Sequence, residues 1–259
     1  MTGSIYMAAN GALAYQTRLE ILSNNLANVN TAGFKQDKSQ FQQYYLNELT
    51  GPDLTASGDA TTSQAPAFWF NLTTHTDHSS GPLKNTGNRF DLAIAGDGFF
   101  CVQTPQGIQY TRRGDFAINA QGLMVTREGW SVLGENGEIT IESKLDISDP
   151  QYQEFMVGDE GSVSVDGKTV GRLRIVEFPN TDVLEKVGDT YFRPNGVNPG
   201  EIDAQDFMIS QGMLELSNVD AVKMMTELIE VHRGYESYLK IIRAVDEVNS
   251  SAVNEVGKA

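Results

Sequence analysis

The chain contains 259 residues, of which 40% are hydrophobic and 20% are charged, and this composition is ordinary for a globular protein. The formal net charge of −15 argues against a nucleic-acid partner and against an anionic membrane surface, because both favour basic faces. Cys101 is the only cysteine, so no disulfide can form within the chain. There is no apolar run of about 18 residues, and the N-terminus lacks a basic region followed by an apolar core. We therefore expect neither a membrane-spanning helix nor a cleavable secretory signal.

The first 35 residues carry the spacing of a coiled-coil helix. Apolar side chains recur at alternating intervals of three and four, which places them on one seam. They are Ile5, Ala8, Ala12, Tyr15, Leu19, Leu22, Leu26 and Val29. The spacing predicts a helix from about Ser4 to Asn28, ended by Gly33 in the left-handed conformation. Gly11 costs this helix about 1 kcal/mol relative to alanine, which indicates either close approach of a neighbouring helix or a weakly specified helix start.

Residues 36–85 differ in character and are assigned to an extended or flexible arm. Glutamines are first interspersed with aromatic residues, and residues 50–64 are then small and polar, with too little apolar surface to order alone. The sequence Phe68-Trp69-Phe70 follows shortly afterwards. It indicates either an arm that carries an aromatic anchor for a partner or an edge of the main core.

Residues 86–212 show the alternation of apolar and polar side chains that is typical of short β-strands. The expected strands contain Phe100 and Val102, Tyr110, Phe116 and Ile118, Leu123 and Val125, Trp130 and Val132, Ile139 and Ile141, Val163 and Val165, and Leu173 and Ile175. Turn sequences such as Gln121-Gly122 and Asn136-Gly137 separate them. Short strands at this spacing predict an antiparallel sandwich or barrel-like domain.

Residues 213–259 repeat the heptad spacing of the N-terminal segment. The seam consists of Met224, Leu228, Val231, Tyr235, Tyr238, Ile242, Val245 and Ala252, with Asn249 in its one polar slot. Ser217-Asn218-Val219-Asp220 offers a weak capping box, which predicts a helix from there to about Val253. The predicted fold is α+β: residues 1–35 and 213–259 form a coiled-coil handle, and residues 86–212 form an inserted antiparallel all-β domain.

Few side chains form a constellation that suggests catalysis. His75, Asp77 and His78 have the residue types of metal ligands, but no cysteine or third histidine lies nearby. Gly96-Asp97-Gly98 lacks the third glycine and the following helix of a dinucleotide-binding loop. We therefore expect no catalytic residue, no cofactor, no metal and no enzymatic activity. Two alternatives stay open: a hydrolase that uses these histidines with Asp77, and an exported binding module that displays Arg113-Gly114-Asp115.

Four blocks of the sequence resemble, in order, those of the bacterial flagellar rod and hook proteins. They are Asn24–Lys35, Asp91–Phe100, Tyr110–Gly122 and Gln211–Asp220. The length is similar to that of rod proteins with one β domain and is short for a hook subunit. The opening Ser4-Ile5-Tyr6 and the stretch Ile241–Asp246 look most like the proximal rod protein, with a distal rod or hook-like axial subunit as the alternative.

The resemblance implies a structural subunit that polymerises into the helical axial tube of the flagellar basal body, transmits torque across the periplasm and is needed for motility. The implied partners are other copies of the chain, other flagellar rod proteins and the flagellar type III export apparatus, through which the chain passes without cleavage of a signal peptide. No nucleic acid and no membrane insertion are implied. Solitary amphipathic helices are marginally stable in water, so the chain ends are expected to fold on assembly.

The residues expected at the assembly interface come from the two seams and the signature blocks. They are Ile5, Ala8, Ala12, Leu19, Leu22, Asn24, Asn25, Leu26, Asn28, Val29, Gly33, Phe34, Ser217, Asn218, Val219, Leu228, Tyr235, Ile242 and Val245. The three asparagines at 24, 25 and 28 are interpreted as amides that hydrogen-bond between packed neighbours and turn the chain outward.

Overall fold

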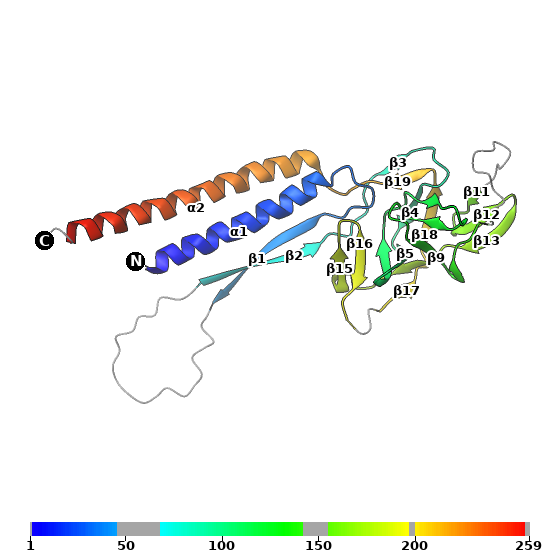
Figure 1. The fold of residues 1–259 in the computed structure, drawn as a ribbon, viewed down its shortest axis with the longest axis horizontal. Coiled ribbons are helices and arrows are strands. Elements are labelled where there is room, and N and C mark those ends of the chain that lie inside the picture. The colour runs from blue at the N-terminus through cyan, green and yellow to red at the C-terminus, as the bar shows by residue number, and fades with distance from the viewer. Residues whose placement is uncertain (1, 46–67, 142–154, 197–199, 257–259) are drawn as a thin grey trace, which may run out of the picture. The chain divides into compact units, whose positions relative to one another are not determined.

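The computed structural model describes residues 2–45, 68–141, 155–196 and 200–256 (Figure 1). The segment 50–64 of the predicted arm lies outside this range. The chain forms two compact units. A helical unit contains Met1–Leu26, Asp37–His75 and Ala221–Ala259, and a β unit contains Ala27–Gln36 and Thr76–Asp220. The chain therefore passes between the two units four times.

The helical unit contains both terminal helices, α1 (Thr2–Ala27) and α2 (Ala221–Val256), which run side by side in opposite directions (Figure 1). The rings of Tyr15 and Tyr238 lie 5.3 Å apart. A β-carbon added to Gly11 would lie 2.5 Å from the Tyr238 ring, and one added to Gly234 would lie 2.2 Å from the Tyr15 ring. The structure therefore supports the close-approach interpretation of Gly11.

The predicted seams coincide with the covered faces of the two helices. In α1, Ala8, Ala12 and Leu22 are buried, and in α2, Met224 and Val231 are buried. The other described seam residues are half-buried: Tyr15, Leu19, Leu26, Leu228, Tyr235, Tyr238, Ile242, Val245 and Asn249. Several apolar side chains outside the seams face solvent: Tyr6, Met7 and Leu13 in α1, and Val222, Met225, Ile229, Ile241 and Val248 in α2. Ala14 is buried although it lies outside the seam.

Two strands complete the helical unit. β1 (Asp37–Tyr45) and β2 (Phe68–Thr76) pair in a two-stranded sheet, so both ends of the predicted arm have an extended backbone. Asn25 fixes the start of β1, because its side-chain amide donates to the Asp37 carbonyl (2.8 Å) and its Oδ1 accepts from the Asp37 amide (2.9 Å).

The β unit is built from antiparallel pairs of short strands. In its largest sheet the neighbouring strands are, in order, β15 (Leu184–Val187), β16 (Tyr191–Pro194), β6 (Gly107–Thr111), β5 (Phe99–Thr104), β9 (Ser131–Gly134), β8 (Met124–Val125) and β7 (Ala117–Ile118). Three further strands pair outside this order: β10 (Gly137–Glu138) with β9, β14 (Ile175–Glu177) with β5, and β17 (Ile202–Asp203) with β14. A single 3-10 turn, Thr181–Val183, precedes β15. The smaller sheets are β11 (Phe155–Val157), β12 (Ser162–Val165) and β13 (Lys168–Arg172); β4 (Leu92–Gly96) and β18 (Phe207–Gln211); and β3 (Leu83–Asn85) and β19 (Met213–Glu215).

The alternation along β5 places its side chains in two cores. Phe100 and Val102 enter the larger core, which also holds Leu92, Ile94, Val132 and Ile209. Phe99 and Cys101 enter a smaller core on the other face with Tyr110, Phe178 and Phe192. Both faces of the central strand are therefore covered by apolar side chains, which is the main stabilising contribution to this unit.

Two boundaries differ from the expectation. β3 begins at Leu83 and β19 ends at Glu215, so β structure extends past both limits of the predicted domain. The predicted cap at Ser217 is wrong, because α2 begins at Ala221 and the Ser217 hydroxyl instead accepts from the Val219 amide (3.2 Å). Over the described residues, neither helix combines the length and apolarity needed to cross a bilayer.

Candidate functional site

Glu215, the last residue of β19, is the centre of a buried group of charges that we name the Glu215 cluster: Lys35, Arg112 and Glu215. The Lys35 Nζ atom lies 2.6 Å from Oε1 of Glu215, and Nη1 of Arg112 lies 3.4 Å from Oε2. The side chains of Lys35 and Glu215 are 0% exposed and that of Arg112 is 3% exposed. The Gly81 amide also donates to Oε1 of Glu215 (2.9 Å). A buried carboxylate with these donors holds two cations in place.

The two cations have further acceptors on the backbone. Lys35 Nζ donates to the Ser79 carbonyl (2.8 Å), and Arg112 donates to the carbonyls of Ile94 (3.3 Å) and Gly96 (2.8 Å). Burial lowers the pKa of Lys35 and the pKa of Arg112, and the nearby Glu215 carboxylate opposes that shift in both. Removal of one partner from a buried ion pair typically costs about 3–5 kcal/mol.

Residues 33–35 follow the N-terminal helix and belong to the β unit. Gly33 has a φ of +68° and donates its amide to the Glu215 carbonyl (2.8 Å), and any β-carbon there would meet the Arg113 backbone at 2.4 Å. Phe34 is 0% exposed, and Lys186 Nζ lies 3.9 Å above its ring. Lys186 also donates to the Lys35 carbonyl (2.7 Å). Gly33 is therefore required by its backbone conformation, Phe34 is fixed by burial, and Lys35 is fixed by its buried ion pair.

The Glu215 cluster brings together all four blocks that resemble the flagellar proteins. Lys35 ends the first block, the Gly96 carbonyl belongs to the second, Arg112 to the third and Glu215 to the fourth. Lys35, Arg112 and Glu215 were all missed as site residues because charged side chains are normally solvated. The alternation of Glu215 with the apolar residues Leu214 and Leu216 predicts an exposed Glu215, so the local pattern gave no signal of its burial.

Asn218, three residues after Glu215, hydrogen-bonds to two other stretches of the β unit. Its Oδ1 accepts from the Gln36 amide (2.8 Å), and its Nδ2 donates to the carbonyls of Asp77 (2.9 Å) and Ser79 (3.2 Å). Gln36 and Asp77 are also joined directly, by Asp77 N to the Gln36 carbonyl (2.9 Å) and by Gln36 Nε2 to Asp77 Oδ2 (3.1 Å).

The histidines expected for a hydrolase have separate environments. His75 is exposed on β2. His78 packs against Phe99 and Phe192, with ring centroids 5.7 and 4.9 Å apart, and its Nδ1 has no hydrogen-bond partner. Burial, together with the charges of Lys35 and Arg112, lowers the pKa of His78 to about 4. Among the residues that the structure describes, no group of three or more His, Cys, Asp or Glu side chains is placed to hold a metal.

The tripeptide Arg113-Gly114-Asp115 is part of an ion-pair network. Arg113 Nε lies 2.5 Å from Asp115 Oδ1, and Nη1 lies 2.8 Å from Glu128 Oε1. Arg113 and Asp115 are only 14% and 18% exposed, and Gly114 is packed against the Leu92 carbonyl. Because its two charges pair with each other, the tripeptide is not displayed as an adhesion loop would be.

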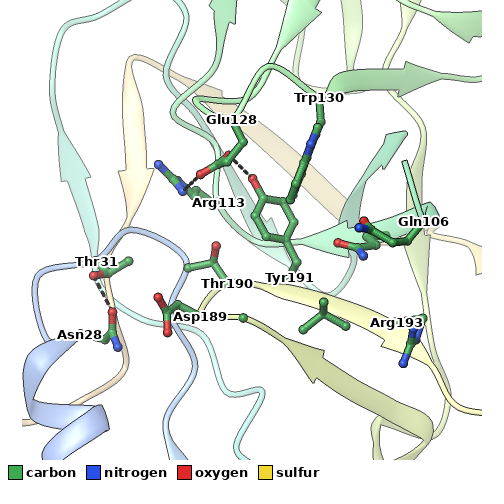
Figure 2. A pocket seen from close by; sticks show the side chains of 13 residues that line it. Asn28, Thr31, Gln106, Arg113, Glu128, Trp130, Asp189, Thr190, Tyr191 and Arg193 are labelled. Carbon is green, nitrogen blue, oxygen red and sulfur yellow. Dashed lines mark hydrogen bonds and ion pairs between the residues drawn. The ribbon is translucent and has the colours of Figure 1, made fainter. Parts of the chain in front are cut away.

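This network forms one wall of an open pocket of about 530 Å³ in the β unit (Figure 2). The Tyr191 hydroxyl donates to Glu128 Oε2 (2.5 Å), and the Trp130 ring packs against Tyr191 at 4.7 Å. Burial and the bond to Glu128 raise the pKa of Tyr191, so its hydroxyl stays protonated. Asn28 and Thr31 line the pocket as well, and they are joined by a hydrogen bond from Thr31 Oγ1 to Asn28 Oδ1 (3.0 Å). Arg113, Glu128 and Tyr191 are therefore bonded to one another, and Asn28 is bonded to Thr31.

The predicted interface residues fall into three classes of exposure. The buried ones are Ala8, Ala12, Leu22, Asn25, Gly33, Phe34, Ser217 and Val219. The half-buried ones are Leu19, Leu26, Asn28, Val29, Asn218, Leu228, Tyr235, Ile242 and Val245. Asn24 is exposed, and the side chain of Ile5 lies outside the described part of the chain. Asn25 and Asn28 have hydrogen-bond partners within the chain itself. The sequence interpretation instead assigned these amides to bonds between packed neighbours.

These features define a class of protein in which both chain ends build one helical unit and the middle of the chain builds an antiparallel β unit. Three stretches match known protein families. Residues 5–35 match the family described as "Flagella basal body rod protein", residues 93–165 the "Flagellar hook protein FlgE/F/G D1 domain", and residues 210–255 the "Flagellar basal body rod FlgEFG protein C-terminal".

Relatives match over nearly the full length of the chain. A flagellar basal-body rod protein FlgG of Bacillus subtilis is 35% identical over 98% of this chain and 99% of its own length. A FlgF protein of Caulobacter vibrioides is 36% identical over 100% and 99%, and a FlgG protein of Agrobacterium fabrum is 31% identical over 95% and 97%. The chain belongs to the flagellar basal-body rod protein family.

Proposed function

We propose that this chain is a structural subunit of the flagellar rod that polymerises into a helical axial tube, transmits torque across the periplasm and is needed for motility. The observation that carries the proposal is the pairing of the two terminal helices at Tyr15 and Tyr238, in a chain whose family match includes both helices. We interpret the pair as a coiled-coil handle, because the residues with heptad spacing form its covered face. Such a subunit has a mechanical role and needs no catalytic step.

A second apolar stripe on α2 supports polymerisation. Val222, Met225 and Ile229 are 75%, 52% and 53% exposed, and they follow one another at intervals of three and four. They are therefore neighbours on one face of the helix, separate from the seam that faces α1. Contact with neighbouring copies or other rod proteins would remove this apolar surface from water. A repeated contact of this kind that does not close into a ring produces a helical filament.

We place the chain in the proximal part of the rod, on the resemblance carried by Ser4-Ile5-Tyr6 and Ile241–Asp246. The relatives carry both the FlgF and the FlgG names at similar identity, so a distal position is the alternative. A density map of purified basal bodies tests this assignment by the height of the subunit along the axis. A subunit found only at the distal end would contradict the proximal assignment.

We further propose export through the flagellar type III apparatus without cleavage of a signal peptide. The chain has no disulfide, and its two end helices are marginally stable alone, so both features favour passage of an unfolded chain. The intact mass of the subunit recovered from basal bodies tests this proposal. A mass that lacks an N-terminal segment would contradict it.

Deletion of residues 1–26 tests the assembly role of the helical unit. The cut leaves Ala27–Gln36 with the β unit, to which the structure assigns these residues. We expect the truncated chain to keep a folded β unit, to be absent from basal bodies and to fail to restore motility in a strain that lacks the gene. Normal motility would contradict the proposed function. Deletion of residues 1–35 is a poorer test, because it also removes Lys35 from the Glu215 cluster.

A further inference from the structure

Three of the four points at which the chain passes between the two units lie at Gln36, Thr76 and Asp220. Gln36 is the last residue before the chain enters Asp37–His75, Thr76 is the first residue after it, and Asp220 precedes Ala221. A single backbone connection can rotate about its φ and ψ angles, so it transmits little torsion unless its ends are fixed. The hydrogen bonds next to these three crossing points decide how firmly each connection is held.

The Asn218 side chain bonds to the segments on both sides of it. The Gln36 amide donates to its Oδ1, a bond that spans 182 positions of sequence, and its Nδ2 donates to the Asp77 carbonyl 141 positions away. The direct bonds between Gln36 and Asp77 close the triangle. One amide side chain therefore joins the chain next to three of the four crossing points.

Asn218 does not serve as the cap of the helix that follows it. The helix α2 begins at Ala221, and the Asn218 amide bonds to Gln36, Asp77 and Ser79 rather than to the helix. An asparagine is suited to this position because it offers one acceptor and two donors on a short side chain. Neither alanine nor aspartate reproduces this combination.

We propose that Asn218 is the positioning residue of a torsional joint, which fixes three of the four chain connections to the β unit so that they bear torque together. The mechanical part of this inference, that the joint bears torque, rests on the proposed function as a rod subunit. The hydrogen-bonded joint itself rests only on the contacts of Asn218, Gln36 and Asp77. The two parts are separable by experiment.

The first test measures hydrogen exchange in the full-length chain. Asn218→Ala removes both arms of the joint, and the exchange of the Gln36 amide proton should accelerate roughly tenfold, the factor set by one hydrogen bond of ordinary net strength. Asn218→Asp keeps an acceptor for the Gln36 amide but leaves the Asp77 and Ser79 carbonyls without their donor. The Gln36 amide should therefore stay protected, while the Asp77 amide, whose own acceptor is the Gln36 carbonyl, is held less firmly and should exchange faster. Asn180→Ala is the matched control, because Asn180 accepts only from the nearby Asp182 amide. Unchanged exchange at Gln36 in Asn218→Ala would overturn the joint.

The second test measures rotation under load, with each variant as the only copy of the subunit in the cell. We expect Asn218→Ala cells to swim normally in dilute medium but to lose filaments in viscous medium, where Asn180→Ala cells keep theirs. If Asn218→Ala does not fold, Asn218→Asp decides through the exchange at Asp77 and through the same motor measurement. If the Asn218 variant shows faster exchange but its cells keep their filaments as wild-type cells do, the torsional role is overturned. Absence of the wild-type chain from basal bodies would instead overturn the proposed function and leave the exchange result intact.

Discussion

Lys35 and Glu215 form an ion pair of 2.6 Å in which neither side chain is exposed to solvent. Lys35 follows the N-terminal helix and Glu215 precedes the C-terminal one, so the pair joins the two ends of the chain inside the β unit. Arg112 adds a second cation to the same carboxylate. The cluster therefore contains one more positive than negative charge, and its single anion supports two buried cations.

Loss of the Glu215 charge should be more harmful than loss of the Lys35 charge. We expect Glu215→Gln to lower the free energy of unfolding of the β unit by about 3–5 kcal/mol, because two buried cations lose their counter-ion. Lys35→Met should cost less, since Arg112 and the Gly81 amide still satisfy Glu215. Denaturant unfolding measures both values, with the exposed Glu138→Gln and Lys84→Met as matched controls. A larger effect of Lys35→Met would contradict this account of the cluster.

His78 should make the β unit less stable in mild acid. Its pKa is about 4 in the folded chain and near the ordinary 6.5 in the unfolded chain, so only the unfolded state binds the proton between these values. Stability is therefore unaffected above about pH 6.5 and falls as the pH drops towards 4, by up to about 3 kcal/mol in total. His78→Phe, which suits the ring cluster of Phe99 and Phe192, should remove this part of the pH dependence. The measurement is the free energy of unfolding of the wild-type chain and of His78→Phe, each at pH 7 and at pH 4.5. The exposed His75→Phe is the control. A difference that does not change with pH would contradict the prediction.

Gly11→Ala should weaken the helix pair although alanine favours helix by about 1 kcal/mol. The added methyl group would lie 2.5 Å from the Tyr238 ring, too close for an ordinary contact. We expect a lower thermal unfolding temperature for the helices, followed by circular dichroism, and recovery when Tyr238→Ala is combined with it. A more stable Gly11→Ala chain would show that the two helices do not approach closely at this point.

Leu22→Asp should prevent assembly without affecting the β unit. Leu22 is 5% exposed in the helical unit, and an unpaired charge at a buried position costs several kcal/mol. Leu13→Asp, at a position of the same helix that is 59% exposed, is the matched control for the stability of the helix. Basal-body incorporation and the unfolding transition of the β unit are the two measurements. An equal loss of stability in the β unit would show that Leu22 belongs to its core.

Periodic features of the fold could be predicted from the sequence. The heptad spacing identified the covered faces of both helices, and alternation identified β5, β6, β9 and β12 because each has one or two buried faces. Strands such as β16, with Pro194 at its end, and β13, with mainly exposed side chains, carry no such alternation. Their pairing depends on neighbours that are distant in sequence, so a local pattern could not reveal them.

The members of the Glu215 cluster were not among the predicted site residues. The blocks that contain Lys35, Arg112 and Glu215 were recognised, yet the pairing of these charges depends on contacts across 103 and 180 positions. Charged residues are normally exposed, so the sequence alone favoured a solvated Lys35. The interpretation of Asn25 as an intermolecular amide was reasonable for a helix surface, but its partner Asp37 lies only 12 positions away in the same chain.

The distance of 180 positions between Lys35 and Glu215 also governs the order in which the molecule can mature. A ribosome makes Lys35 long before Glu215, and a chain threaded from its N-terminus would emerge in the same order. Until the last fifth of the polypeptide is present, Lys35 lacks its counter-ion and the Gly33 amide lacks its acceptor, both of which Glu215 supplies. The ion pair between Lys35 and Glu215 can therefore form only after almost all of the chain between these two residues has been made or exported.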